Sequence, residues 1–362
     1  MILPATPEEL ARELAAAQAE GKTITLSGNG TKSLMGGPIV ESDVSISTAR
    51  LNRVLQYEPG DLTVSVEAGI TYRELSAILA DQHQMIPLDP PFSENASIGG
   101  IVASNSSGPR RRLYGTARDM VIGMTFATLE GKLIPTGGMV VKNVAGLDMG
   151  KLMIGSFGTL AAIAIVNFKL HPMPAASRTF VRRFDKLPDA IAARDTILKS
   201  VLQPTAIDLL KMPEGCELYV QAAGNAAVLD RYSREFEGAE VLEGEAERAL
   251  WTRIREFTPS ILASHPSMTV ARISCTLSEV GKVLESLPAP ALARAGSGVC
   301  YGYFNDPSEA VGRGVIEFAP QSVRETAELW PAPGSDFAMM EKIKQMFDPR
   351  LLLNRRRLYG RI

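Results

Sequence analysis

Residues 96–115, ASIGGIVASNSSGPRRRLYG, restrict the fold of this chain more than any other stretch of its sequence. Small side chains dominate the stretch, yet Ile98, Ile101 and Val102 stand at positions where a flexible linker would not need them. A packed core segment would require more bulk. We therefore interpret the small residues as room for a molecule that lies directly against the backbone.

The same stretch predicts a short helix that begins after Ser97. Serine is a preferred helix cap, and the unpaired N–H groups of a first helical turn favour an anion. We expect Ile98, Gly99 and Gly100 to present these N–H groups to a pyrophosphate, with Ala103 leaving further space.

Two other loops of small residues have the same character. GNGTKS, residues 28–33, follows a predicted strand, and its glycines allow successive N–H groups to point at one anion. GSFGT, residues 155–159, precedes the apolar run 160–166. Ser33 replaces the third glycine of the dinucleotide fingerprint in residues 28–33. For any one of these loops alone, we favour a simple turn over a phosphate site. The three loops within one domain favour a phosphate site.

Bulk properties exclude several classes of protein. The net charge of −2 gives no electrostatic case for binding nucleic acid, and no apolar run reaches the roughly 18 residues of a transmembrane helix. The first 21 residues read as a capped helix rather than a signal peptide, so we expect a cytoplasmic protein. Cys216, Cys275 and Cys300 are far apart and form no CxxC pair, and we expect neither a metal ion nor an iron–sulfur cluster.

The order of predicted elements is that of an α+β protein with two domains. Residues 1–172 form the first domain, with a strand at 62–69 in which Val64 and Val66 alternate with polar residues, and a hairpin that turns at Glu130-Gly131. Residues 178–318 form a second α+β domain, whose sheet we expect to be mixed or antiparallel with helices on one face. Residues 335–362 form a C-terminal helix and a basic tail.

Four segments carry a resemblance to a known family. SGNGTKS (27–33), residues 88–115, residues 137–172 and MFDPRLLLN (346–354) resemble flavoproteins of the vanillyl-alcohol oxidase/p-cresol methylhydroxylase type. SGPRRRLYG and KNVAGLDMGKLMIGSFGTL are more narrowly similar to the FAD-binding subunit of bacterial glycolate oxidases. The resemblance covers the first 172 residues and the tail, whereas the middle of the chain matches only in its length and in its general pattern of residues.

The resemblance implies an FAD-binding domain of two α+β subdomains, with the cofactor in the groove between them, and a smaller α+β cap domain. Matched residue by residue, it implies that the following residues contact FAD: Gly28, Asn29, Gly30, Thr31, Lys32, Ser33, Ser97, Ile98, Gly99, Gly100, Ala103, Ser104, Asn105, Ser107, Gly108, Tyr114, Gly115, Gly155, Gly158, Thr159, Ile163 and Asn354. These loops contain no histidine or cysteine, which implies non-covalent FAD. Asn354 is followed by Arg355-Arg356 where the family often has Pro-Gly.

Several polar residues have two readings. Arg110, Arg111 and Arg112 could neutralise a phosphate or a carboxylate, but adjacent side chains cannot all face one ligand, so we favour a solvated face or a partner contact for at least two of them. Further candidates with structural or flavin-tuning roles are Lys142, Asn143, Asp148 and Lys151. Three residues of the second domain could face the flavin: Arg272, Tyr301 and Tyr303. Packing within the sheet is the commoner role for such residues.

The resemblance also implies a function and partners. It predicts an FAD-dependent oxidoreductase that acts as one subunit of a glycolate oxidase on a small 2-hydroxy acid, with a sister flavin subunit and an iron–sulfur subunit. Membrane association, if present, would come through those partners. A stand-alone FAD-linked oxidoreductase and a non-catalytic flavin subunit stay open, because the histidine-rich metal motif of related hydroxy-acid enzymes is absent and no catalytic base stands out. The only histidines are His83, His171 and His265.

Overall fold

The computed structural model describes residues 1–140 and 148–362 of the chain. They divide into two units: the first holds Met1–Ser107, Thr116–Met173 and Ala332–Ile362, and the second holds Gly108–Gly115 and Pro174–Pro331. The C-terminal segment thus groups with the first unit, whereas residues 108–115, which we placed in the first domain, group with the second. Lys142 and Asn143 lie outside the described residues.

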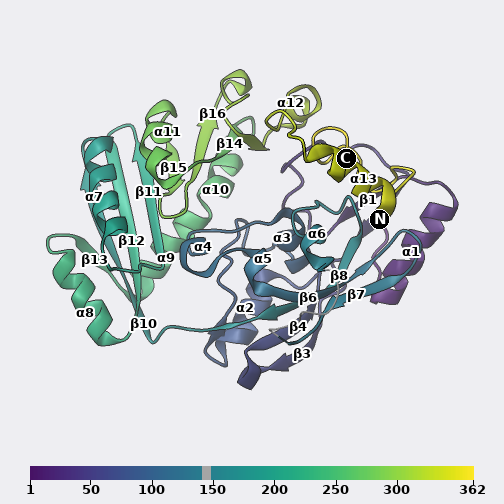
Figure 1. Ribbon diagram of the computed structural model, residues 1–362, viewed down its shortest axis with the longest axis horizontal. Helices are drawn as coiled ribbons and strands as arrows, with labels where there is room; N and C mark the ends of the chain where they lie inside the picture. Colours follow the sequence, from purple (N-terminus) through teal and green to yellow (C-terminus); the bar gives the residue numbers. More distant parts are fainter. Residues whose placement is uncertain (141–147) are drawn as a thin grey trace. The chain divides into compact units, whose positions relative to one another are not determined.

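A small sheet in the first unit joins the two ends of the chain. Strands β1 (Ile24–Ser27) and β2 (Val44–Ser47) pair in parallel. Single bridges extend the pair on both sides, from Ile46 to Ile2 and from Ile24 to Leu353. In Figure 1 the yellow C-terminal segment accordingly lies beside the purple N-terminal part.

The larger sheet of this unit is antiparallel and has the order β3-β4-β8-β6-β7. Its strands are β3 (Val54–Glu58), β4 (Thr63–Glu67), β8 (Ala162–Lys169), β6 (Val121–Ala127) and β7 (Leu133–Gly137). The hairpin predicted at Glu130-Gly131 is confirmed, with Gly131 at φ +78°. The strand predicted at 62–69 is confirmed as β4, and all five of its residues are buried, the polar ones as well as Val64 and Val66.

Helix α1 (Pro7–Ala19) packs between the two sheets. Its Leu10 and Leu14 share one apolar core with Ile24 and Ile46 of the small sheet and with Ala164 of the large one. The remaining elements of the unit are 3-10 helix η1 (Pro59–Asp61), α2 (Tyr72–Ala80), the strand pair β5 (Gln84–Met85) and β9 (His171–Pro172), α3 (Ile98–Ser104), α5 (Ala117–Met120), α6 (Gly150–Met153) and α13 (Phe337–Phe347).

The second unit is built on one eight-stranded antiparallel sheet of order β13-β10-β12-β11-β15-β16-β14-β17. The strands are β10 (Ala176–Phe184), β11 (Ala206–Met212), β12 (Gly215–Gly224), β13 (Glu240–Leu242), β14 (Thr269–Ser274), β15 (Ala291–Arg294), β16 (Val299–Phe304) and β17 (Val315–Phe318). Every pairing recorded in this sheet is antiparallel, which settles the alternative left open by the sequence.

Helices cover both faces of that sheet, not one as predicted. Cys300 and Phe304 of β16 belong to the core formed with α7 (Leu187–Lys199), α8 (Ala226–Glu235) and α11 (Val280–Ser286). Tyr303 points to the opposite face because side chains alternate along a strand, and there its hydroxyl lies 2.8 Å from that of Thr258 in α10 (Phe257–Ser264). The other elements are α4 (Arg111–Tyr114), α9 (Gly244–Arg255), η2 (Leu277–Glu279), η3 (Pro307–Glu309) and α12 (Gln321–Thr326).

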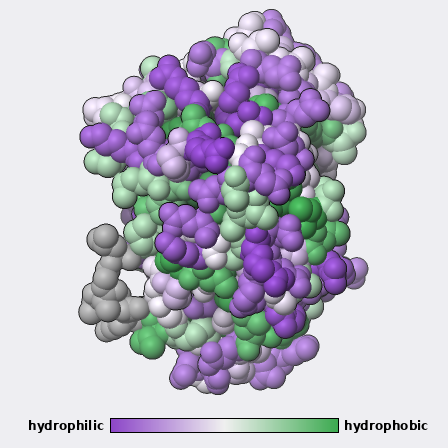
Figure 2. Space-filling model, turned by 90° about the vertical axis from the view of Figure 1, so that its right-hand side faces the viewer, coloured by the Kyte–Doolittle hydropathy of each residue, from purple (hydrophilic) through white to green (hydrophobic). Residues whose placement is uncertain are grey.

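No helix among the described residues is long and apolar enough to cross a bilayer. On the face shown in Figure 2, hydrophobic surface is divided into small areas by hydrophilic side chains.

Candidate cofactor site

A pocket in the first unit collects most of the predicted FAD contacts. The predicted residues that line it are Gly28, Asn29, Gly30, Thr31, Lys32, Ser33, Ser97, Gly99, Gly100, Ala103, Ser104, Gly158, Ile163 and Asn354. The pocket is thus lined by four segments that are far apart in sequence. They are the loop of residues 28–33 (the first loop), helix α3, the loop of residues 155–159 (the third loop) and the C-terminal tail.

The loop after β1 offers free hydrogen-bond donors to this pocket. Within the described structure, the main-chain N–H groups of residues 28–31 find no acceptor in the protein, whereas Ser33 N–H donates to the Gly30 carbonyl at 3.1 Å. Gly30 has φ +72°, a left-handed conformation that glycine adopts without strain. Consecutive unpaired N–H groups in such a turn form an anion-binding nest.

The first turn of α3 does not have the predicted role. Ser97 does cap the helix, but Ile98 N–H donates to the Ile70 carbonyl at 2.9 Å and Gly99 N–H to the Ala68 carbonyl at 2.7 Å. Gly100 N–H retains only the 3.3 Å contact with the Ser97 hydroxyl. Because the N–H groups of Ile98 and Gly99 donate to the turn that follows β4, the helix supplies at most one N–H to a pyrophosphate.

Close packing explains two of the glycines that line the pocket. A Cβ on Gly28 would collide with the Ser97 hydroxyl, so the first loop and the α3 cap are in direct contact. A Cβ on Gly99 would lie 2.8 Å from that of Ala68, so this glycine allows α3 to pack closely against the turn that follows β4. Gly100 is different: its Cβ would meet only Ser97 Oγ, at 3.1 Å, so its surroundings are otherwise open.

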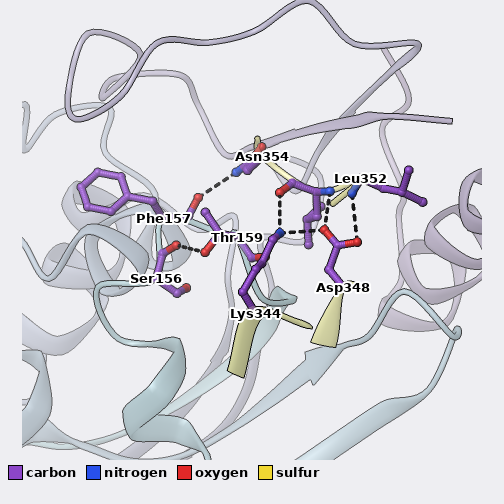
Figure 3. Close-up of polar contacts among 8 residues, drawn as sticks. Ser156, Phe157, Thr159, Lys344, Asp348, Leu352 and Asn354 are labelled. Atoms are coloured by element: carbon purple, nitrogen blue, oxygen red, sulfur yellow. Dashed lines mark hydrogen bonds and ion pairs between the residues drawn. The ribbon is translucent and has the colours of Figure 1, made fainter. Parts of the chain in front are cut away.

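The tail closes the pocket through Asn354. Its side-chain oxygen accepts from Leu26 N–H at 2.7 Å, and its amide nitrogen donates to the carbonyls of Leu26 at 3.1 Å and Phe157 at 2.7 Å. A Cβ on Gly158 would approach that nitrogen to 2.8 Å. The side chain therefore continues the hydrogen bonding of β1 and fixes the third loop beside it, as Figure 3 shows for Phe157.

Residues outside the predicted set of FAD contacts complete the lining. They are Ile24, Thr25, Leu26, Ser27, Ile39, Val40, Ser42, Thr48, Phe157, Ala161, Arg355 and Arg357. Arg357 is buried, donates to the carbonyls of Gly37 and Met35 at 2.7 Å each, and lies 5.7 Å from the centre of the Phe157 ring. Arg357 of the basic tail thus has a structural role, which the sequence alone did not indicate.

The charge of the pocket matches an anionic dinucleotide. Lys32, Arg355 and Arg357 line it, and no aspartate or glutamate is among its lining residues within the described chain. Nor does any lining residue carry an imidazole or a thiol, the groups that could bond covalently to a flavin. The donor nest at residues 28–31 and the cations of the lining suit the pyrophosphate of FAD.

Eight predicted contacts do not line this pocket. They are Ile98, Asn105, Ser107, Gly108, Tyr114, Gly115, Gly155 and Thr159. Gly108, Tyr114 and Gly115 belong to the second unit. Thr159 is fully buried and donates to the Ser156 carbonyl at 2.8 Å, so its role in the loop is structural.

Arg110, Arg111 and Arg112 are all partly buried, so they do not form the fully solvated face that we considered. Arg112 donates to the Gly296 carbonyl at 3.3 Å within the second unit, and burial lowers its pKa. Arg272 pairs with Glu317 at 3.0 Å on the sheet face that also bears Tyr301, whose pKa burial raises to about 12. No group of three or more potential metal ligands occurs among the described residues.

Comparisons with known proteins identify the domain. Residues 1–137 match the family model described as an FAD binding domain. The chain is 32% identical over 234 residues to "Glycolate oxidase subunit GlcE" of Escherichia coli (strain K12), covering 64% of this chain and 63% of that protein. It is 28% identical over 213 residues to "Glycolate oxidase subunit GlcD" of Bacillus subtilis (strain 168), covering 59% and 45%. With "D-lactate dehydrogenase" of Anaerostipes hadrus it shares 28% over 246 residues, covering 66% and 50%.

Solved structures show the same fold over nearly the whole chain. A 4-ethylphenol oxidase from Gulosibacter chungangensis has TM-score 0.75 at 16% identity, covering 98% of this chain and 88% of that one. An alkyldihydroxyacetonephosphate synthase has TM-score 0.72 at 20% identity, covering 97% and 75%.

The chain is therefore a flavoprotein with an FAD-binding domain of the p-cresol methylhydroxylase type, and FAD is its cofactor. Its sequence is similar to those of FAD-linked oxidoreductases, among them glycolate oxidase subunits. The chain spans less than two thirds of the length of these curated relatives.

Proposed function

We propose that this chain is a flavin subunit of a glycolate oxidase complex, in which a small 2-hydroxy acid is oxidised and electrons pass through FAD to partner subunits. The similarity to the glycolate oxidase subunit of Escherichia coli is the observation that carries the proposal. The partners would be a sister flavin subunit and an iron–sulfur subunit, in the cytoplasm or at a membrane through those partners.

The chemistry explains why a partner is part of the proposal. Oxidising a hydroxy acid removes a hydride from carbon and a proton from oxygen, and FAD supplies the hydride acceptor. A residue must still hold the carboxylate and another must take the proton. His83, His171 and His265 lie in separate segments, and no potential metal-ligand cluster occurs in the described part of the chain. We therefore assign hydroxy-acid oxidation to the sister subunit and electron handling to this chain.

A second candidate is a stand-alone FAD-linked oxidoreductase. One observation favours it: the sheet of the second unit carries a buried ion pair between Arg294 and Asp208 and a nearby pair between Arg272 and Glu317. Buried ion pairs seldom repay their desolvation, so a binding role would explain their presence. A non-catalytic subunit that retains the flavin fold is the remaining alternative.

Anaerobic mixing separates these candidates. The purified chain, loaded with FAD, is mixed with glycolate or D-lactate while the flavin absorbance is followed. The proposal expects no bleaching within seconds by the chain alone and bleaching once the sister subunit is added. Bleaching by the chain alone would establish the stand-alone enzyme, whereas no bleaching of its flavin in either mixture would favour the non-catalytic subunit.

A further inference from the structure

We propose that residues 348–357 act as a strap that completes the FAD pocket, and that the buried pair of Lys344 and Asp348 is the latch that holds it. The inference concerns binding of the cofactor and does not depend on which substrate is oxidised. Lys344 and Asp348 are positioning residues in it, because neither lines the pocket.

The latch is a fully hydrogen-bonded ion pair at the end of α13. Lys344 Nζ donates to Asp348 Oδ2 at 2.6 Å, to the Thr159 carbonyl at 2.7 Å and to the Leu353 carbonyl at 3.1 Å. These bonds use all three donors of the ammonium group. Figure 3 shows the ammonium group of Lys344 between Thr159 and Asp348.

Asp348 folds the following residues around its carboxylate. Oδ1 accepts from Leu352 N–H at 2.9 Å and Oδ2 from Leu353 N–H at 2.8 Å. The side chains of Lys344 and Asp348 are 2% and 0% exposed, so removing one partner would leave the other charge buried without compensation. The latch therefore sets the path of the chain immediately before the strap reaches the pocket.

The strap is then fixed in register with β1. Ile24 N–H donates to the Leu352 carbonyl at 2.8 Å, and Asn354 N–H donates to the Ile24 carbonyl at 2.9 Å. This register places the Asn354 carboxamide between Leu26 and Phe157. Beyond it, Arg355 and Arg357 become part of the pocket wall.

Docking of the strap and binding of FAD should consequently favour each other. The strap contributes two cations and one amide to the lining of a pocket whose ligand carries a pyrophosphate. If a docked strap raises the affinity for FAD, FAD must stabilise the docked strap by the same factor, because binding linkage is reciprocal.

Titration of the apoprotein with FAD tests the latch. We expect Lys344→Met to raise the Kd of FAD by at least about tenfold. Lys342→Met is the matched control, because Lys342 is an exposed lysine of the same helix and its replacement removes the same charge. Circular dichroism of both apoproteins establishes that they are folded. A folded Lys344→Met variant that binds FAD as tightly as Lys342→Met would overturn the proposal, because a residue with only a structural role would lower stability without changing the Kd.

Limited proteolysis of the unmodified chain tests the reciprocal effect and needs no variant. Arg350 and Arg356 of the strap are exposed and are trypsin sites. We expect saturating FAD to slow cleavage after these residues at least about fivefold, while AMP alone, which lacks the pyrophosphate, protects less. Equal cleavage rates with and without FAD would refute the strap, even if Lys344→Met failed to fold. Neither experiment measures turnover, so its outcome is independent of the proposed reaction.

Discussion

Replacing Gly100 with valine should weaken FAD binding severely with little loss of fold. Gly100 lies in α3, lines the pocket and has no positive φ, so the backbone conformation does not itself require glycine. Its added Cβ would touch only Ser97 Oγ, at 3.1 Å. Disturbing the 3.3 Å capping bond costs about 1 kcal/mol, and the better helix propensity of valine returns a few tenths. The melting temperature should therefore fall by only about 1–3 °C.

The effect on the cofactor should be much larger. Valine adds an isopropyl group to the pocket wall, near the loop of residues 28–31 whose N–H groups donate to no acceptor in the described structure. Hydrogen bonds to a charged group contribute about 1.5–3 kcal/mol each, so losing two of them costs about 3–6 kcal/mol. At 1.4 kcal/mol per factor of ten, the Kd of FAD should rise at least about 100-fold.

The assay is quenching of flavin fluorescence during titration of the apoprotein. Gly60→Val is the matched control, because a Cβ at Gly60 meets nothing within 4 Å and this residue does not line the pocket. If Gly100→Val is folded and binds FAD within about threefold of Gly60→Val, residues 97–104 do not border the cofactor.

Three further predictions concern the cofactor bond, acid stability and thiol chemistry. FAD should be non-covalent, so acid precipitation should release all flavin into the supernatant; a yellow pellet would contradict this. Hydrogen bonds from the side chain and backbone of Thr71 lower the pKa of Glu74, so this group stabilises the folded protein above the ordinary glutamate pKa and loses that effect as the pH falls through its lowered value. Urea unfolding should show that Glu74→Gln costs at most about 1 kcal/mol at pH 7 and nearly nothing at pH 3, whereas an unchanged cost would exclude the charged cap. Burial raises the pKa of the Cys300 thiol, so a thiol reagent at pH 8 should label Cys300 only in denaturant, and rapid labelling of the native chain would show that the second unit opens.

Local chemistry made several features predictable from sequence. The turn at Glu130-Gly131 requires positive φ, which favours glycine, and Ser97 before a helix has a preferred capping role. The clustering of small residues around 28–33 and 97–104 indicated a ligand against the backbone, and the structure brings these segments together at one pocket. Such signals are readable because each depends on neighbouring residues.

The tertiary structure alone decided which groups face the pocket. Ile98 and Gly99 carry the N–H groups that a helix start normally leaves free, but Ile70 and Ala68 accept them. Likewise, nothing in the sequence indicates that the Arg357 guanidinium donates a hydrogen bond to the Met35 carbonyl. Nor does it indicate that the Asn354 carboxamide accepts one from the N–H of Leu26, 328 residues away. A main-chain N–H makes one strong hydrogen bond, and whether it remains available for a ligand depends on which distant segment folding places beside it.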